Sequence, residues 1–151
     1  MAYNLFKFLH ITGAIAWIGG TVMLTALNVR LAREGEGAQA ALARASGTLG
    51  RVLVGPAAAL TLIAGITTAA VGGIDMSALW ITWGFTGIIV SIVLGATVIR
   101  RTTASLETAL AGNPGPTPER VAALRGRLTG LNLLNLLVLL SVVAAMVFKP
   151  A

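Results

Sequence analysis

Four long runs of apolar residues alternate with two stretches that carry nearly all of the charge. The runs extend from about Leu5 to Val29, Val52 to Val71, Leu79 to Ile99 and Leu128 to Phe148. A helix that crosses a bilayer needs about 20 predominantly apolar residues, because the hydrocarbon core is about 30 Å thick. The pattern therefore predicts an all-α, four-helix transmembrane bundle of up-down topology, with residues 1–151 in a single integral membrane domain.

The two charged connections, residues 30–51 and 100–127, decide the predicted orientation. They hold nine of the eleven Lys and Arg residues, whereas Lys7 and Lys149 lie on the other side. Because cytoplasmic connections carry an excess of Lys and Arg, we expect both connections in the cytoplasm and both termini outward, in the plasma (inner) membrane. The basic residues are then placed to meet anionic lipid headgroups.

Helical extensions of the spans are expected within these connections. The segment 39–45 is rich in alanine, and Thr117-Pro118 has the form of an N-cap followed by a first-turn proline. The segment 113–116 contains two prolines and must interrupt the helix. In the second span, Gly55-Pro56 predicts a kink or a tightened turn.

Composition excludes several classes of protein. The chain is 56% hydrophobic and only 11% charged, whereas soluble domains carry about 25% charge, so an ordinary soluble enzyme and a disordered chain are both excluded. The net charge of +6 does not indicate a nucleic-acid partner, because the basic residues flank apolar spans. Cysteine is absent, which excludes disulfides and thiolate sites.

Small residues recur at every fourth position on two spans. This spacing lets helix backbones approach closely in lipid, either within the bundle or at the interface of a homo-oligomer or a larger membrane complex. The residues are Ala57, Thr61, Gly65, Ala69 and Gly73 on the second span, and Gly87, Ser91 and Gly95 on the third.

His10 is the only histidine and the only ionisable residue placed well inside a span. Such a group is a candidate functional site, although a neutral histidine bonded to a neighbouring helix is an equally weighted interpretation. With 3.6 residues per turn, it shares one helix face with Gly13, Trp17 and Gly20. That face of small residues suits either a closely packed helix or a flat ligand.

Other ligand-capable residues are expected at the same outer level. Met76 follows Asp75 in the outer turn, and Met146 lies near the end of the fourth span. A histidine with thioethers suits Cu(I), and a His/Met axial pair suits haem, so the candidate metal ligands are His10, Met146 and Met76. Methionine also fills gaps in apolar cores, which is the alternative interpretation.

Standard catalytic groups are missing from the sequence. No acidic residue lies in a span, which argues against a proton or cation relay, and there is no second histidine, carboxylate pair or phosphate loop. Asn132, Asn135 and Ser141 on the fourth span are expected to cross-link helices. We therefore do not expect an enzyme that uses protein groups alone; an enzymatic role would require a haem-dependent membrane oxidoreductase.

The segment Phe8-Leu-His10-Ile-Thr-Gly13-Ala-Ile-Ala-Trp17-Ile-Gly19-Gly20 resembles the first helix of the CopD-like group of small membrane proteins. That group includes the copper-resistance D domain and, more distantly, the haem-dependent protoporphyrinogen oxidase. The resemblance implies a helical bundle whose first-helix histidine binds haem or copper, with His10, Gly13, Trp17 and Gly20 as cofactor-binding residues. Haem-binding relatives tend to carry more than one histidine, so a bis-histidine haem here would need two chains.

Two functions from different classes remain open on the sequence. The first is a membrane protein with a haem b or copper site near the outer leaflet that handles electrons or metal. The second is a cofactor-free structural or accessory subunit of a larger membrane complex, and the absence of any cofactor is equally defensible. A small transporter or channel is a third, weaker hypothesis.

Overall fold

The computed structural model describes residues 1–30, 33–111 and 117–149. Helices make up most of this part of the chain. Within those ranges there is no strand, so the predicted all-α class is confirmed. The predicted break at 113–116 lies outside the described residues. The helices are α1 (Ala2–Arg30), α2 (Glu36–Leu49), α3 (Gly55–Val71), α4 (Leu79–Leu94), α5 (Arg100–Ala111) and α6 (Pro118–Phe148).

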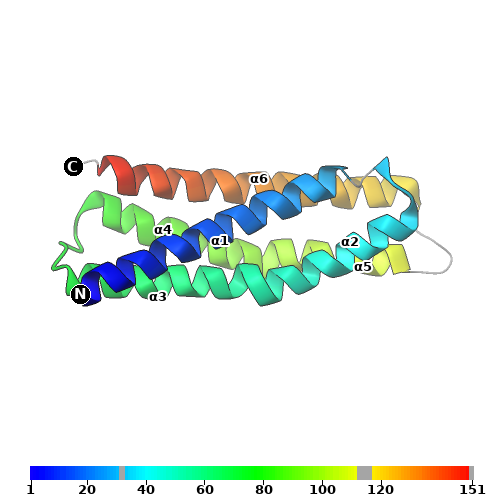
Figure 1. Cartoon of the computed structure of the whole chain (residues 1–151). Coiled ribbons are helices and arrows are strands. Elements are labelled where there is room, and N and C mark those ends of the chain that lie inside the picture. The colour runs from blue at the N-terminus through cyan, green and yellow to red at the C-terminus, as the bar shows by residue number, and fades with distance from the viewer. Residues whose placement is uncertain (31–32, 112–116, 150–151) are drawn as a thin grey trace.

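These helices form four long rods, because π-helical segments at Gly50–Val54 and Gly95–Ile99 join α2 to α3 and α4 to α5 (Figure 1). Each rod is long and apolar enough to cross a membrane. The shortest has 29 residues, about 43 Å, which exceeds the bilayer core of about 30 Å. The rods therefore extend beyond the apolar spans.

The rods alternate in direction along the chain, as the up-down topology requires. The N-terminus, the C-terminal end of α6 and the turn between α3 and α4 lie at one end of the bundle, here called the terminal end (Figure 1). The C-terminal ends of α1 and α5 and the N-terminal ends of α2 and α6 lie at the other end, here called the Arg-rich end.

The bundle is built from two closely packed pairs, α1 with α3 and α4 with α6. Its central apolar cluster takes side chains from both pairs: Trp17, Ala57, Ala58, Ile88, Leu139 and Val142. Many large apolar side chains point outward instead, such as Ile63 and Leu137, which are 63% and 65% exposed. An apolar outer surface of this kind is suited to lipid rather than to water.

The irregularity predicted at Gly55-Pro56 is found one turn earlier, as the π-helical segment Gly50–Val54. The backbone N–H of Gly55 donates to the carbonyl of Gly50, five residues back. Proline has no N–H and its ring crowds the carbonyl four residues before it, so the helix widens ahead of Pro56 rather than tightening.

The turn at the terminal end depends on a glycine and an aspartate. Gly73 has a φ of +58°, a left-handed conformation that glycine adopts without a steric penalty. Asp75 Oδ1 accepts hydrogen bonds from the hydroxyl of Ser77 at 2.7 Å and from its backbone N–H at 2.9 Å. These bonds favour the carboxylate and hold the pKa of Asp75 below its ordinary value.

Candidate functional site

His10 lies on α1 toward the terminal end and is packed against α3. Its Nδ1 atom is 2.7 Å from the backbone carbonyl oxygen of Thr61. The ring also covers Gly65, where a Cβ atom would lie 2.8 Å from Nδ1 and 2.9 Å from Cε1. The absence of a side chain at Gly65 is therefore what lets the imidazole reach the backbone of α3.

This hydrogen bond determines which nitrogen of His10 carries the proton. A carbonyl oxygen can only accept, so Nδ1 must donate, and in the neutral ring the lone pair is then on Nε2. Within the described ranges, Nε2 has no hydrogen-bond partner. The ring is thus oriented through one nitrogen while the other is left available as an acceptor or a metal ligand.

The small residues that share the face of His10 contact α3 and the π-helical segment Gly50–Val54 that precedes it. A Cβ atom on Gly13 would lie 2.7 Å from Thr61 Oγ1 and 3.2 Å from the Ala57 carbonyl, and one on Gly20 would lie 3.2 Å from Val54 Cγ2. Trp17, on the same face, is 3% exposed and belongs to the central cluster. The sequence allows either a closely packed helix or a flat ligand on this face, and in the structure helix α3 packs against it at Gly13.

Among the described residues, neither candidate methionine ligand has a hydrogen bond to His10, and the contacts known for each lie elsewhere. Met146 packs between α6 and α4, where its Cε atom would be 2.9 Å from a Cβ on Gly84. Met76 lies in the turn at the terminal end and is 52% exposed. Among the described residues, no group of three or more His, Asp or Glu could hold a metal ion.

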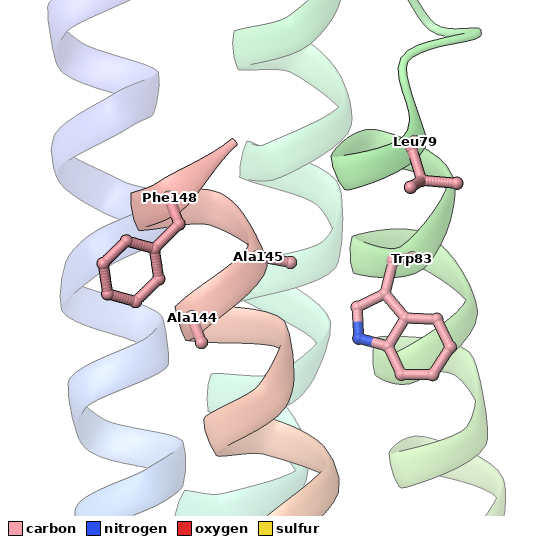
Figure 2. A pocket seen from close by; sticks show the side chains of 5 residues that line it. All are labelled: Leu79, Trp83, Ala144, Ala145 and Phe148. Carbon is pink, nitrogen blue, oxygen red and sulfur yellow. The ribbon is translucent and has the colours of Figure 1, made fainter. Parts of the chain in front are cut away.

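An apolar groove lies between α4 and α6 at the terminal end, on the outer surface of the bundle. It has a volume of about 450 Å³, and its lining residues are Leu79, Trp83, Ala144, Ala145 and Phe148 (Figure 2). The indole N–H of Trp83 donates to Ser141 Oγ at 3.3 Å, which explains one of the polar residues of the fourth span. Such an open apolar groove suits lipid chains and contains no ligating group.

Buried polar residues gather toward the Arg-rich end. Ser91 donates to Asn135 across α4 and α6, so the prediction that amides cross-link the helices is confirmed at Asn135. Asn28 donates to Thr129 Oγ1 at 3.3 Å across α1 and α6. Arg125, expected from the sequence among the basic residues at the membrane surface, is only 8% exposed.

Comparison with known proteins identifies the family. The model of a family described as predicted integral membrane protein (DUF2269) matches residues 4–150, nearly the whole chain, and the chain belongs to this family. No match was found among the curated proteins or among the solved structures. The protein is therefore an integral membrane protein with four candidate spans.

Proposed function

We propose that this member of the family binds haem b through Nε2 of His10. The observation that carries the proposal is the hydrogen bond from Nδ1 to the Thr61 carbonyl. Ligating histidines are oriented in the same way, by an acceptor on the ring nitrogen that does not hold the metal. The likeness of residues 8–20 to the first helix of CopD-like proteins directs attention to the same side chain.

Haem suits this single histidine better than copper does. A copper ion needs several protein ligands, but Met146 packs against Gly84 of α4 and Met76 is 52% exposed in the turn at the terminal end. Haem iron already has four ring nitrogens and needs one axial imidazole from the chain. His10 of a second copy would supply the other axial ligand of a bis-histidine centre.

Gly13 and Gly20 would then act on the cofactor indirectly. Gly13 contacts α3 and Gly20 contacts the π-helical segment that precedes it, so both set how closely α1 approaches this rod and thereby position the imidazole. The cofactor would lie on the Nε2 side of the ring, which the hydrogen bond from Nδ1 to Thr61 leaves available. When bound, haem supplies one-electron transfer, here near the end of the bundle that we expect to face outward.

An absorption spectrum of the protein purified from its native membrane tests the proposal. We expect a Soret band and a pyridine haemochrome spectrum typical of haem b, both lost in His10→Ala. Thr12→Ala is the matched control, because Thr12 is exposed on the same turn and should leave the spectrum unchanged.

Metal analysis of the same sample separates the alternatives. If the sample contains copper but no haem, and the copper is lost in His10→Ala, then the cofactor at His10 is copper rather than haem. A sample with neither, and with no uptake of added haemin or Cu(I), would rule out both cofactors.

A cofactor-free accessory subunit is the second candidate function, and one observation favours it. Gly126 and Gly130 lie four residues apart on α6, and a Cβ atom on either would meet nothing within 4 Å. Small residues at this spacing permit close contact with a helix of another protein. This function predicts co-purification with a larger membrane complex at fixed stoichiometry, and isolation of the protein alone from native membranes would argue against it.

A further inference from the structure

Arg125 is a buried cation at the Arg-rich end of the bundle. It lies on the same face of α6 as Leu128 and Asn132, and the three side chains are 8%, 5% and 9% exposed. Its Nη2 atom donates to Oε1 of Gln39 on α2 at 2.8 Å. Its Nε and Nη1 atoms are buried and have no hydrogen-bond partner in the part of the chain that the structure describes.

The unpartnered N–H groups of Arg125 call for hydrogen-bond acceptors, and an acceptor with negative charge would also balance the guanidinium. The guanidinium stays protonated, with one hydrogen on Nε and two on Nη1. The amide of Gln39 accepts one bond but brings no charge, and within the described ranges no carboxylate pairs with Arg125. A buried cation without a counter-charge is strongly unfavourable, and donors without acceptors add to the penalty.

The charges around Arg125 favour an anion of more than one negative charge. Several arginines surround this end of the bundle on exposed positions: Arg44, Arg51, Arg100, Arg101, Arg120 and Arg127. The acidic residue Glu107 of α5 is half-buried. Its Oε2 atom lies against α2, 3.8 Å from where a Cβ atom on Gly47 would be. Gly47 is about two turns of α2 beyond Gln39. The local potential is therefore positive, which attracts anions.

We propose that Arg125 binds the phosphate group of an anionic ligand between α2 and α6. A phosphate offers several acceptor oxygens and up to two negative charges, which matches the unpartnered donors and the positive surroundings. Because Nε and Nη1 are buried, the Arg125 side chain must turn toward a ligand at the bundle surface for these atoms to be reached. The phosphate comes either from an anionic lipid headgroup or from a soluble phosphate compound.

Thermal unfolding of the full chain distinguishes the two sources. One arm compares inorganic phosphate with chloride at equal ionic strength, in non-ionic detergent. The other compares nanodiscs of phosphatidylglycerol with nanodiscs of phosphatidylcholine. We expect the unfolding midpoint to rise by about 5 °C or more in at least one arm, because a ligand that binds only the folded state stabilises it. A response to phosphate indicates a soluble ligand, and a response to phosphatidylglycerol alone indicates a headgroup.

Two charge-neutralising variants locate the effect. Arg125→Gln should lose the response, whereas Arg127→Gln removes the same charge from an exposed position on the same helix and should keep it.

Gln39→Glu places a carboxylate against Arg125 and should raise the midpoint without any added anion while abolishing the response. This variant remains informative if Arg125→Gln fails to fold. No response in either arm, an equal response in both arginine variants, or a full response in Gln39→Glu would each overturn the proposal.

Discussion

Helices α1 and α3 approach each other closely at Gly13. Because a larger residue has no room there, we predict that Gly13→Ala destabilises the bundle. The new methyl group would lie 2.7 Å from Thr61 Oγ1, 3.1 Å from the Thr61 backbone nitrogen and 3.2 Å from the Ala57 carbonyl oxygen. Two of these atoms belong to the backbone. The third is held by its own hydrogen bond to the Ala57 carbonyl at 2.8 Å, so none of them can move aside freely.

The size of the effect follows from comparison with Gly19→Ala. A Cβ atom on Gly19 would meet nothing within 4 Å, so that variant should gain only the helix propensity of alanine over glycine, about 0.5–1 kcal/mol. Gly13→Ala has the same gain but also overpacks the interface, which typically costs about 1–3 kcal/mol. Because the propensity is common to both variants, their free energies of unfolding should differ by about 1–3 kcal/mol.

Unfolding of the purified protein by titration with SDS in mixed micelles provides the assay. Loss of helical circular dichroism and the change in tryptophan fluorescence, to which the buried Trp17 contributes together with Trp80 and Trp83, should report the same transition. The fitted free energy of unfolding should be lower for Gly13→Ala than for Gly19→Ala. Equal values for the two variants would refute the close approach of α1 and α3 at Gly13.

Three further experiments test other contacts. Gly65→Ala should displace the imidazole that covers this glycine and, if haem is bound, shift the Soret band while retaining the histidine; an unshifted spectrum would contradict this. Ser77→Ala removes the hydroxyl that lowers the pKa of Asp75 most, so the carboxyl ¹³C titration by NMR should move to higher pH yet stay below the ordinary value, since the backbone donor remains. Without that shift, the turn would differ from the one described. A double-mutant cycle of Ser91→Ala and Asn135→Ala should give a coupling of about 0.6–1.7 kcal/mol in unfolding free energy, and additive effects would exclude a net contribution from their hydrogen bond.

The fold class is accessible from the sequence because length and composition alone determine it. Apolar runs of about 20 residues can satisfy their backbone in lipid only as helices, and Thr117 and Pro118 occupy the N-cap and first turn of α6 as predicted. Which helices pack against one another cannot be predicted in this way. Small residues mark a close approach, but the sequence does not indicate that Gly13 contacts Thr61 while Gly87 contacts Val142.

The burial of Arg125 could have been recognised from its spacing. Arginines next to a span usually extend to the membrane surface, so the sequence predicts that all of them meet headgroups and set the topology. Arg125, however, shares a helix face with the buried residues of α6: Leu128, Asn132, Asn135, Leu139 and Val142. The same periodicity that relates His10 to Gly13 and Trp17 applies here, and a polar residue on a buried face requires a partner.

The two proposals rest on different pairs of helices, and they can therefore fail separately. His10 is held between α1 and α3, where glycine contacts bring the backbones close enough for Nδ1 to reach the Thr61 carbonyl. Arg125 belongs to α6, whose side chains form hydrogen bonds with α1, α2 and α4. Loosening α1 from α3 should disturb the imidazole and leave the environment of Arg125 intact. Neutralising Arg125 should leave the imidazole in place, since no described contact connects the two residues.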